Sequence, residues 1–140
     1  MKKICLVLLT LCMLGGFFIT SAEAGQLCWQ TDSTSDILDG YFIATVSGGK
    51  LSRLVHGVWY NIMYWPLAGN MVKTPDGSRW FLQLNTTYVG NYLGIVVNLD
   101  SSTLSGTGGA SLIGDTFTEY DITFTSISCK AVPPYVPPTQ

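Results

Sequence analysis

The chain has 140 residues, 47% of them hydrophobic, and a formal net charge of −2. This length corresponds to one ordinary domain that can bury a hydrophobic core without metals. Basic residues are few, and after the first three positions they are scattered, which makes a nucleic-acid surface unexpected. These scattered basic residues are Lys50, Arg53, Lys73, Arg79 and Lys130.

Residues 1–24 have the order of a secretory signal peptide. Two lysines at positions 2–3 precede an apolar run over 4–19, and Ala-Glu-Ala at 22–24 supplies a small-x-small cleavage site. The apolar run is shorter than the roughly 20 residues that a membrane-spanning helix needs. We therefore expect cleavage before Gly25 and a secreted or periplasmic protein that does not span the membrane afterwards. Its eight acidic and five basic residues give a formal charge of −3.

Two of the four cysteines remain after residue 24, namely Cys28 and Cys129. An even pair in an oxidising compartment predicts one disulfide, here joining the first and last strands. It closes a loop of about 100 residues, for which the chain-entropy model gives about 4.7 kcal/mol. The distant spacing and the single histidine of the chain do not suggest a redox or zinc site, so no metal or cofactor is expected.

From residue 25 onward, short strands alternate with turn signals, and no amphipathic helix is evident. Gly, Asn and Asp supply the turn conformations that hairpins need, at a spacing near ten residues. The turn candidates are Asp39-Gly40, Gly48-Gly49, Ala68-Gly69-Asn70, Pro75-Asp76-Gly77, Gly90-Asn91, Asp100-Ser101, Gly108-Gly109 and Gly114-Asp115. The segment "STLSGTGGASLIGD" (102–115) is poor in side-chain bulk and predicts a bent strand or a close backbone approach.

Several segments alternate apolar and polar residues with period two, the mark of a half-buried strand. In the last strand we expect Tyr120, Ile122 and Phe124 to face the core. Cys129 has the opposite parity from Phe124, so we expect a bulge near Thr125-Ser126 that returns the cysteine toward the core. The remaining residues 131–140 form a Pro-rich tail of polyproline type, which either docks on a partner or stays unpacked.

The pattern predicts one all-β domain over residues 25–130. Sequential hairpins with stapled ends favour an antiparallel meander closed into an up-and-down β-barrel of about eight strands. The alternative is a β-sandwich. An immunoglobulin-type sandwich fits less well, because its cysteines lie on internal strands.

A secreted meander of this length, with Trp29 in its first strand, is similar in outline to small lipocalin-like and avidin-like barrels. The segment "LIGDTFT" (112–118) resembles the last hairpin of the avidins. That resemblance would place a ligand-contacting Asp of the family at Asp115. Because the Gly-x-Trp of the lipocalins is absent, and the other biotin-binding residues of the avidins have no counterparts here, the resemblance implies the barrel shape and not biotin binding.

The stretch "SRLVHGVWYNIMYW" (52–65) is apolar on both faces of an extended strand, unlike a strand with one wet face. Three explanations stay open: a bend at Gly57 or Asn61 that exchanges the faces, a cavity on one face with a subunit contact on the other, or a lipid-facing wall, which fits worst. For a cavity, large aromatic residues with polar tips suit a small ligand. The candidate ligand residues are His56, Trp59, Tyr60, Met63 and Trp80.

No catalytic residues are assigned. The single His56 has no recognisable nucleophile partner, no GxSxG elbow is present, and most acids lie in turns. The sequence therefore predicts a non-catalytic barrel that binds a small apolar or aromatic molecule. The alternative is a structural or interaction module that self-associates through its aromatic strand, and a hydrolase ranks third.

Overall fold

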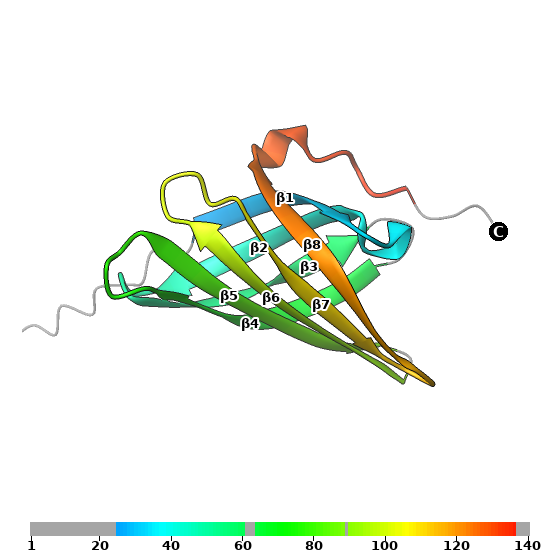
Figure 1. Ribbon diagram of the computed structural model, residues 1–140. Helices are drawn as coiled ribbons and strands as arrows, with labels where there is room; N and C mark the ends of the chain where they lie inside the picture. The colour runs from blue at the N-terminus through cyan, green and yellow to red at the C-terminus, as the bar shows by residue number, and fades with distance from the viewer. Residues whose placement is uncertain (1–24, 61–63, 89, 137–140) are drawn as a thin grey trace, which may run out of the picture.

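The computed structural model describes residues 25–60, 64–88 and 90–136, which form eight strands and two short 3-10 turns (Figure 1). The strands are β1 (Gly25–Ser33), β2 (Gly40–Gly48), β3 (Ser52–Tyr60), β4 (Tyr64–Lys73), β5 (Arg79–Tyr88), β6 (Asn91–Asp100), β7 (Gly106–Ile113) and β8 (Phe117–Ile127). The 3-10 turns are η1 (Asp36–Leu38), between β1 and β2, and η2 (Cys129–Ala131), after β8.

Each strand pairs antiparallel with the next one, and β1 also pairs with β8, so the sheet closes into a barrel. The closing seam runs from the pair Cys28–Ile127 to the pair Ser33–Ile122. The expected all-β meander barrel is confirmed, and the sandwich alternative is wrong. The molecule has the overall shape of a calycin-type barrel, in which closure leaves no unpaired strand edge.

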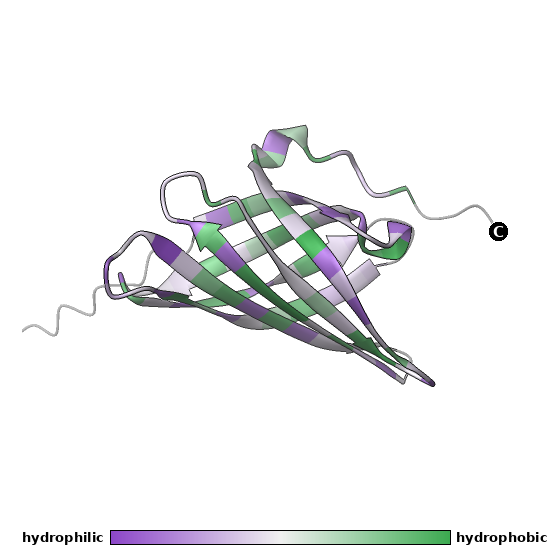
Figure 2. Ribbon diagram, viewed as in Figure 1, coloured by the Kyte–Doolittle hydropathy of each residue, from purple (hydrophilic) through white to green (hydrophobic). Residues whose placement is uncertain are grey.

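The interior of the barrel is filled with apolar side chains, because every strand points alternate residues inward. Figure 2 shows this alternation as hydrophobic and hydrophilic bands along the strands. The buried core comprises Trp29, Leu38, Phe42, Ala44, Val46, Val55, Trp59, Trp65, Leu67, Met71, Trp80, Leu82, Leu84, Leu93, Ile95, Val97, Leu99, Ala110, Ile122 and Phe124. As expected, Ile122 and Phe124 are buried, and Tyr120 packs partly against the core.

Each end of the barrel is closed by a loop tied to a core side chain. At one end, the indole N–H of Trp29 donates to the carbonyl of Leu104 in the β6–β7 loop, at 2.7 Å. At the other, Leu38 of η1 enters the core, and its carbonyl accepts from the Thr31 hydroxyl at 3.0 Å. The Trp59 indole in turn donates to the Thr31 oxygen at 2.9 Å. A buried polar group needs such a partner, so these bonds fix both loops over the core.

The expected disulfide is confirmed, but the bulge that should have brought it inward is wrong. Cys28 and Cys129 are bonded, at a sequence separation of 101. The register of β1 against β8 is continuous through Thr125 and Ser126. Cys28 therefore lies on the outer face, with the opposite orientation from Trp29, and it is buried there rather than in the core. The chain reaches it by turning into η2, whose first residue is Cys129.

Two of the expected turns lie inside strands. Gly69 belongs to β4 and Gly108 to β7. Both face inward, and a Cβ atom added to either would collide with the neighbouring strand, at the carbonyl of Gln83 or of Val96. Glycine is needed there because the backbones approach closely where the barrel wall curves. The close-approach interpretation of the Gly-rich segment is thus confirmed, whereas the turn interpretation of Gly108-Gly109 is wrong.

The aromatic stretch keeps one orientation along all of β3. Its registers against β2 and β4 are unbroken, so an exchange of faces at Gly57 is wrong. Val55 and Trp59 point into the core, while Leu54 and His56 are exposed on the outer wall. Asn61, the other bend candidate, lies outside the described residues.

The neighbouring glycines of β7 provide a matched test of the barrel geometry. Gly108→Ala is expected to lower the free energy of unfolding by about 1–3 kcal/mol, since its Cβ must displace the Val96–Val97 backbone. Gly109→Ala, on the outer face, places its Cβ 3.9 Å from the carbonyl oxygen of Tyr120, which is ordinary van der Waals contact. It should change stability by no more than about 0.5 kcal/mol. Urea unfolding followed by Trp fluorescence compares them, and equal effects would contradict the inward glycine assignment.

Candidate functional site at the basic end of the barrel

The five residues proposed from sequence as a ligand site do not converge. Trp59 and Trp80 are buried in the core, where each packs as an inward-facing residue. His56 and Tyr60 lie on the outer face of the wall. Met63 lies outside the described residues. Since the described members lie on opposite faces of the wall, they do not line one pocket.

Ionisable residues are instead segregated along the barrel axis. One end, called the basic end here, carries the β2–β3, β4–β5 and β6–β7 loops and the exit of β8 (Figure 1). All five Lys and Arg residues of the described chain lie there, together with two acids, Asp76 and Asp100. Six acids lie toward the opposite end: Asp32, Asp36, Asp39, Asp115, Glu119 and Asp121. Such a distribution produces a field that draws anions to the basic end.

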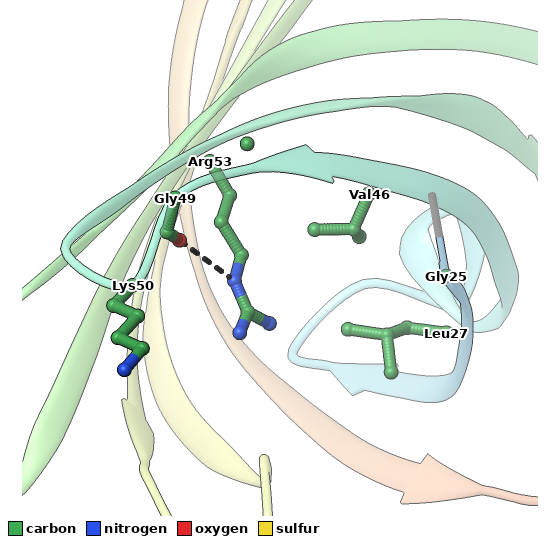
Figure 3. A pocket seen from close by; sticks show the side chains of 7 residues that line it. Gly25, Leu27, Val46, Gly49, Lys50 and Arg53 are labelled. Carbon is green, nitrogen blue, oxygen red and sulfur yellow. Dashed lines mark hydrogen bonds between the residues drawn. The ribbon is translucent and has the colours of Figure 1, made fainter. Parts of the chain in front are cut away.

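A pocket of about 310 Å³ opens at the basic end (Figure 3). Its lining combines an apolar wall, a glycine hairpin and two cations: Gly25, Leu27, Val46, Gly48, Gly49, Lys50 and Arg53. Figure 3 shows the guanidinium of Arg53 projecting between Lys50 and the apolar pair of Leu27 and Val46. An apolar wall with a few convergent polar groups is typical of small-ligand sites.

Arg53 occupies a position where the strand pattern calls for a core residue. It lies on the inner face of β3, opposite the buried Met71 of β4, and is half-buried. Its Nε donates to the Gly49 carbonyl at 3.3 Å, and its guanidinium carbon lies 4.7 Å from the centre of the Trp80 ring. No carboxylate forms an ion pair with it among the residues that the structure describes. A partly desolvated guanidinium without an anion is costly, and this is the site's least satisfied feature.

Trp80 holds two cations at once. The ammonium nitrogen of Lys73 lies 5.5 Å from its ring centre, in addition to the guanidinium of Arg53. Both contacts are of the cation–π type, which fixes the position of a side chain without neutralising its charge. Trp80, predicted as a ligand residue, therefore belongs to the core and contacts Arg53 and Lys73 through its ring.

The β2–β3 hairpin shapes the pocket rim. Gly48 has φ of +133°, and a Cβ there would lie 2.8 Å from the Ser52 carbonyl oxygen. Only glycine fits this conformation and this space. The Gly49 amide donates to the same carbonyl at 2.9 Å, which leaves the Gly49 carbonyl to accept from Arg53. The turn expected at Gly48-Gly49 is thus confirmed, and it also orients the arginine.

Sequence reasoning did not identify this site, because the basic residues lie far apart along the chain. A local signal existed, however. In the alternation of residues 52–60, Arg53 has the same parity as Val55 and Trp59. The pattern therefore places a charged residue on the same strand face as two apolar ones. The sequence did not reveal that Lys50, Lys73 and Arg79 lie at the same end of the barrel.

The two acids of the basic end are engaged in their own loops. Asp76 accepts from the Thr74 hydroxyl at 2.6 Å and from the Ser78 hydroxyl at 2.7 Å. Asp100 accepts from the hydroxyl and the amide of Ser102 and from the Thr103 amide, the amide bonds being 2.8 and 3.0 Å long. These hydrogen bonds, led by the serine and threonine hydroxyls, lower the pKa of each carboxyl to about 2. Both acids thus serve as turn caps rather than as partners of Arg53.

The lowered pKa of Asp100 predicts a pH-dependent loop contribution. A carboxyl whose folded pKa is depressed stabilises the fold above its ordinary value near 3.8, and this contribution is lost as pH falls through about 2. Asp100→Asn should therefore lower the melting temperature at pH 7, with a difference that shrinks toward pH 2. Thermal unfolding of both proteins over that range tests this, and a pH-independent difference would contradict it.

The outer wall offers a second, more open hollow of about 610 Å³ beside His56, with Pro66, Thr87 and Tyr92 among its lining residues. Within the described chain, no hydrogen bond joins the His56 imidazole to another side chain. The described residues also contain no group of three or more His, Cys, Asp or Glu side chains that could hold a metal ion. Among those same residues, no helix has the length and apolar character to cross a membrane.

Asp115, the position indicated by the avidin resemblance, lies in the turn between β7 and β8 and is exposed at the end opposite the basic pocket. Comparison of the chain with protein-family models, with curated proteins and with solved structures gives no match. The resemblance thus extends to the barrel shape alone.

Proposed function

We propose that this protein is a non-catalytic binding module of an oxidising, extracytoplasmic compartment, and that its ligand is a small anion with a short apolar portion. The disulfide between Cys28 and Cys129 suggests such a compartment. Secretion by a signal peptide at residues 1–24 is part of the proposal. The ligand would enter the basic pocket rather than the centre of the barrel, which apolar side chains fill.

The half-buried guanidinium of Arg53 carries this proposal. It is held by Trp80 and by the Gly49 carbonyl, yet it meets no carboxylate among the described residues. A carboxylate, sulfonate or phosphate ester would complete its hydrogen bonding. Leu27 and Val46, on the opposite wall, would then receive the apolar portion of the same molecule.

The proposed ligand is an anion with an apolar portion, whereas the sequence alone predicted an apolar or aromatic molecule. A pocket of about 310 Å³ suits a small ligand. The surplus of positive charge around the rim favours an anionic ligand and would raise its rate of association. If residues 1–24 are removed, the new amino group of Gly25 adds a further positive charge at the pocket.

Three ligands with the same chain length test the proposal: hexanoate, hexanol and hexylammonium. We expect the protein of residues 25–140 to bind hexanoate, with a change in the fluorescence of Trp80, and hexylammonium not at all. Arg53→Gln should weaken hexanoate binding about tenfold or more, because a hydrogen bond to a charged group contributes about 1.5–3 kcal/mol. Isothermal titration calorimetry supplies the affinities.

Arg79→Gln is the matched control, since it removes the same charge at the same end without lining the pocket. It should leave hexanoate binding within about twofold. Equal binding of hexanol and hexanoate would reject the anionic class in favour of a purely apolar ligand. Equal effects of the two arginine substitutions would show a diffuse charge effect and reject the pocket.

A second candidate function is self-association, favoured by an apolar outer patch that consists of Leu54, Val72 and Phe81. These side chains are 66%, 43% and 50% exposed. Val72 and Phe81 are direct cross-strand partners, and Leu54 lies on the adjoining strand. Exposed aromatic and aliphatic groups that adjoin one another are typical of protein contacts.

Sedimentation velocity tests this patch. If it forms a dimer contact, the chain should dimerise at micromolar concentration, and Leu54→Ser with Phe81→Ser should return it to a monomer. Phe117→Ser removes an exposed aromatic residue at the start of β8, away from the patch. It is the control and should leave the dimer intact. A monomer at all concentrations, or an equal effect of the control, would exclude the patch.

A further inference from the structure

In addition to the basic pocket, the outer wall of the barrel carries a tyrosine groove that is covered by the chain's own C-terminal tail. The groove consists of Tyr41 of β2, Tyr60 of β3 and Tyr64 of β4, which are neighbours across the sheet. The Tyr60 and Tyr64 rings stack with their centres 6.3 Å apart, and Tyr41 lies 6.1 Å from Tyr60. The tail leaves η2 and runs back along the outside of the barrel toward this groove (Figure 1).

The tail contacts the groove through one hydrogen bond to its backbone and through the ring of Tyr135. The Tyr60 hydroxyl donates to the Pro133 carbonyl at 2.5 Å. The Tyr135 ring meets Tyr60 and Tyr64 edge-on, at centre distances of 5.5 and 5.4 Å. Burial raises the pKa of Tyr60 above its ordinary value. These contacts explain why Tyr60, although on the outer face, is buried.

Aromatic grooves recognise proline-rich chains through the same kinds of contact, namely ring packing and hydrogen bonds to backbone carbonyls. A polyproline segment is already extended and loses little entropy on binding, while its carbonyls remain free to accept hydrogen bonds. Val132 begins the tail with φ of −69° and ψ of 122°, an extended conformation near polyproline II. Tyr60 supplies the hydroxyl donor, and the neighbouring rings supply the flat apolar surface.

The tail fits the groove incompletely. A hollow of about 220 Å³ remains between tail and barrel, lined by Gly40, Tyr41, Tyr60 and residues 133–136. Pro133 and Pro134 are exposed, and Val136 is 76% exposed. A longer or better-fitting segment could therefore make more contacts than the tail does.

We infer that the tyrosine groove is a docking site for a proline-rich, extended segment of a partner protein, and that the tail of residues 132–136 is a built-in competitor for it. A second copy is a poorer occupant. Tethering four residues from the disulfide-anchored Cys129 gives Pro133 a local concentration in the millimolar range, which an identical tail on another molecule does not match. A partner must instead carry a segment that contacts more of the groove.

A labelled peptide with the sequence of residues 132–140 serves as the probe, and fluorescence anisotropy measures its binding to the complete chain of residues 25–140. Tyr135→Ala in the protein weakens the internal competitor by removing two ring contacts. It should therefore raise the affinity for the peptide about tenfold. The same substitution in the peptide should abolish binding. Both results follow only if tail and peptide compete for one site.

A second pair of variants keeps the test independent of the tail. In the Tyr135→Ala protein, adding Tyr60→Phe removes only the hydroxyl donor and should lower peptide affinity severalfold. Adding Tyr92→Phe, on β6 and away from the tail, should not. Absence of peptide binding to the Tyr135→Ala protein would overturn the inference, as would equal affinities with and without that substitution. A dimer of the unaltered chain that dissociates with Tyr135→Ala would assign the groove to a second copy and overturn the partner inference too.

Discussion

The pairing of β1 with β8 is the constraint on which the rest of the structure depends. Without that seam, the first and last strands would each expose an unpaired edge, and half of every strand's side chains would lose the common interior. The disulfide between Cys28 and Cys129 ties η2 to β1 from the outer face, at one end of the seam. Because the bond lies outside, the interior beside the seam stays free for Trp29 and Phe124.

Closure in turn decides where recognition can take place. Large inward residues such as Trp29, Phe42 and Trp59 fill the barrel, and Leu38 and Leu104 close its ends. Apolar side chains fill the part of the interior that the structure describes, so we place recognition at the rim and on the outer wall. Arg53 is the clearest candidate, since it continues an inward row but ends in a charge that meets no described carboxylate. Separation of acids from bases along the axis then gives the two ends opposite surplus charge.

The strand pattern made the fold predictable, because period-two alternation and closely spaced turns leave few architectures open. The disulfide followed from two cysteines at the ends of the chain. Gly69 and Gly108 were misread as turn residues because a single glycine signals a turn and a close strand approach alike. The aromatic residues were misread as one site because their two faces separate only once the registers are known. The role of Tyr60 could not be predicted, because its hydroxyl bonds to Pro133, 73 residues away in sequence.

The central claim is that the interior is closed to ligands and that recognition begins at the basic end. Chemical-shift mapping during a hexanoate titration tests it most directly, since backbone and methyl signals report every part of the barrel at once. We expect shifts confined to Leu27, Val46, Gly49 and Arg53, with the mid-barrel methyl groups of Leu84 and Leu93 unchanged. Shifts centred on those interior methyl groups would show a ligand inside the barrel and contradict the account.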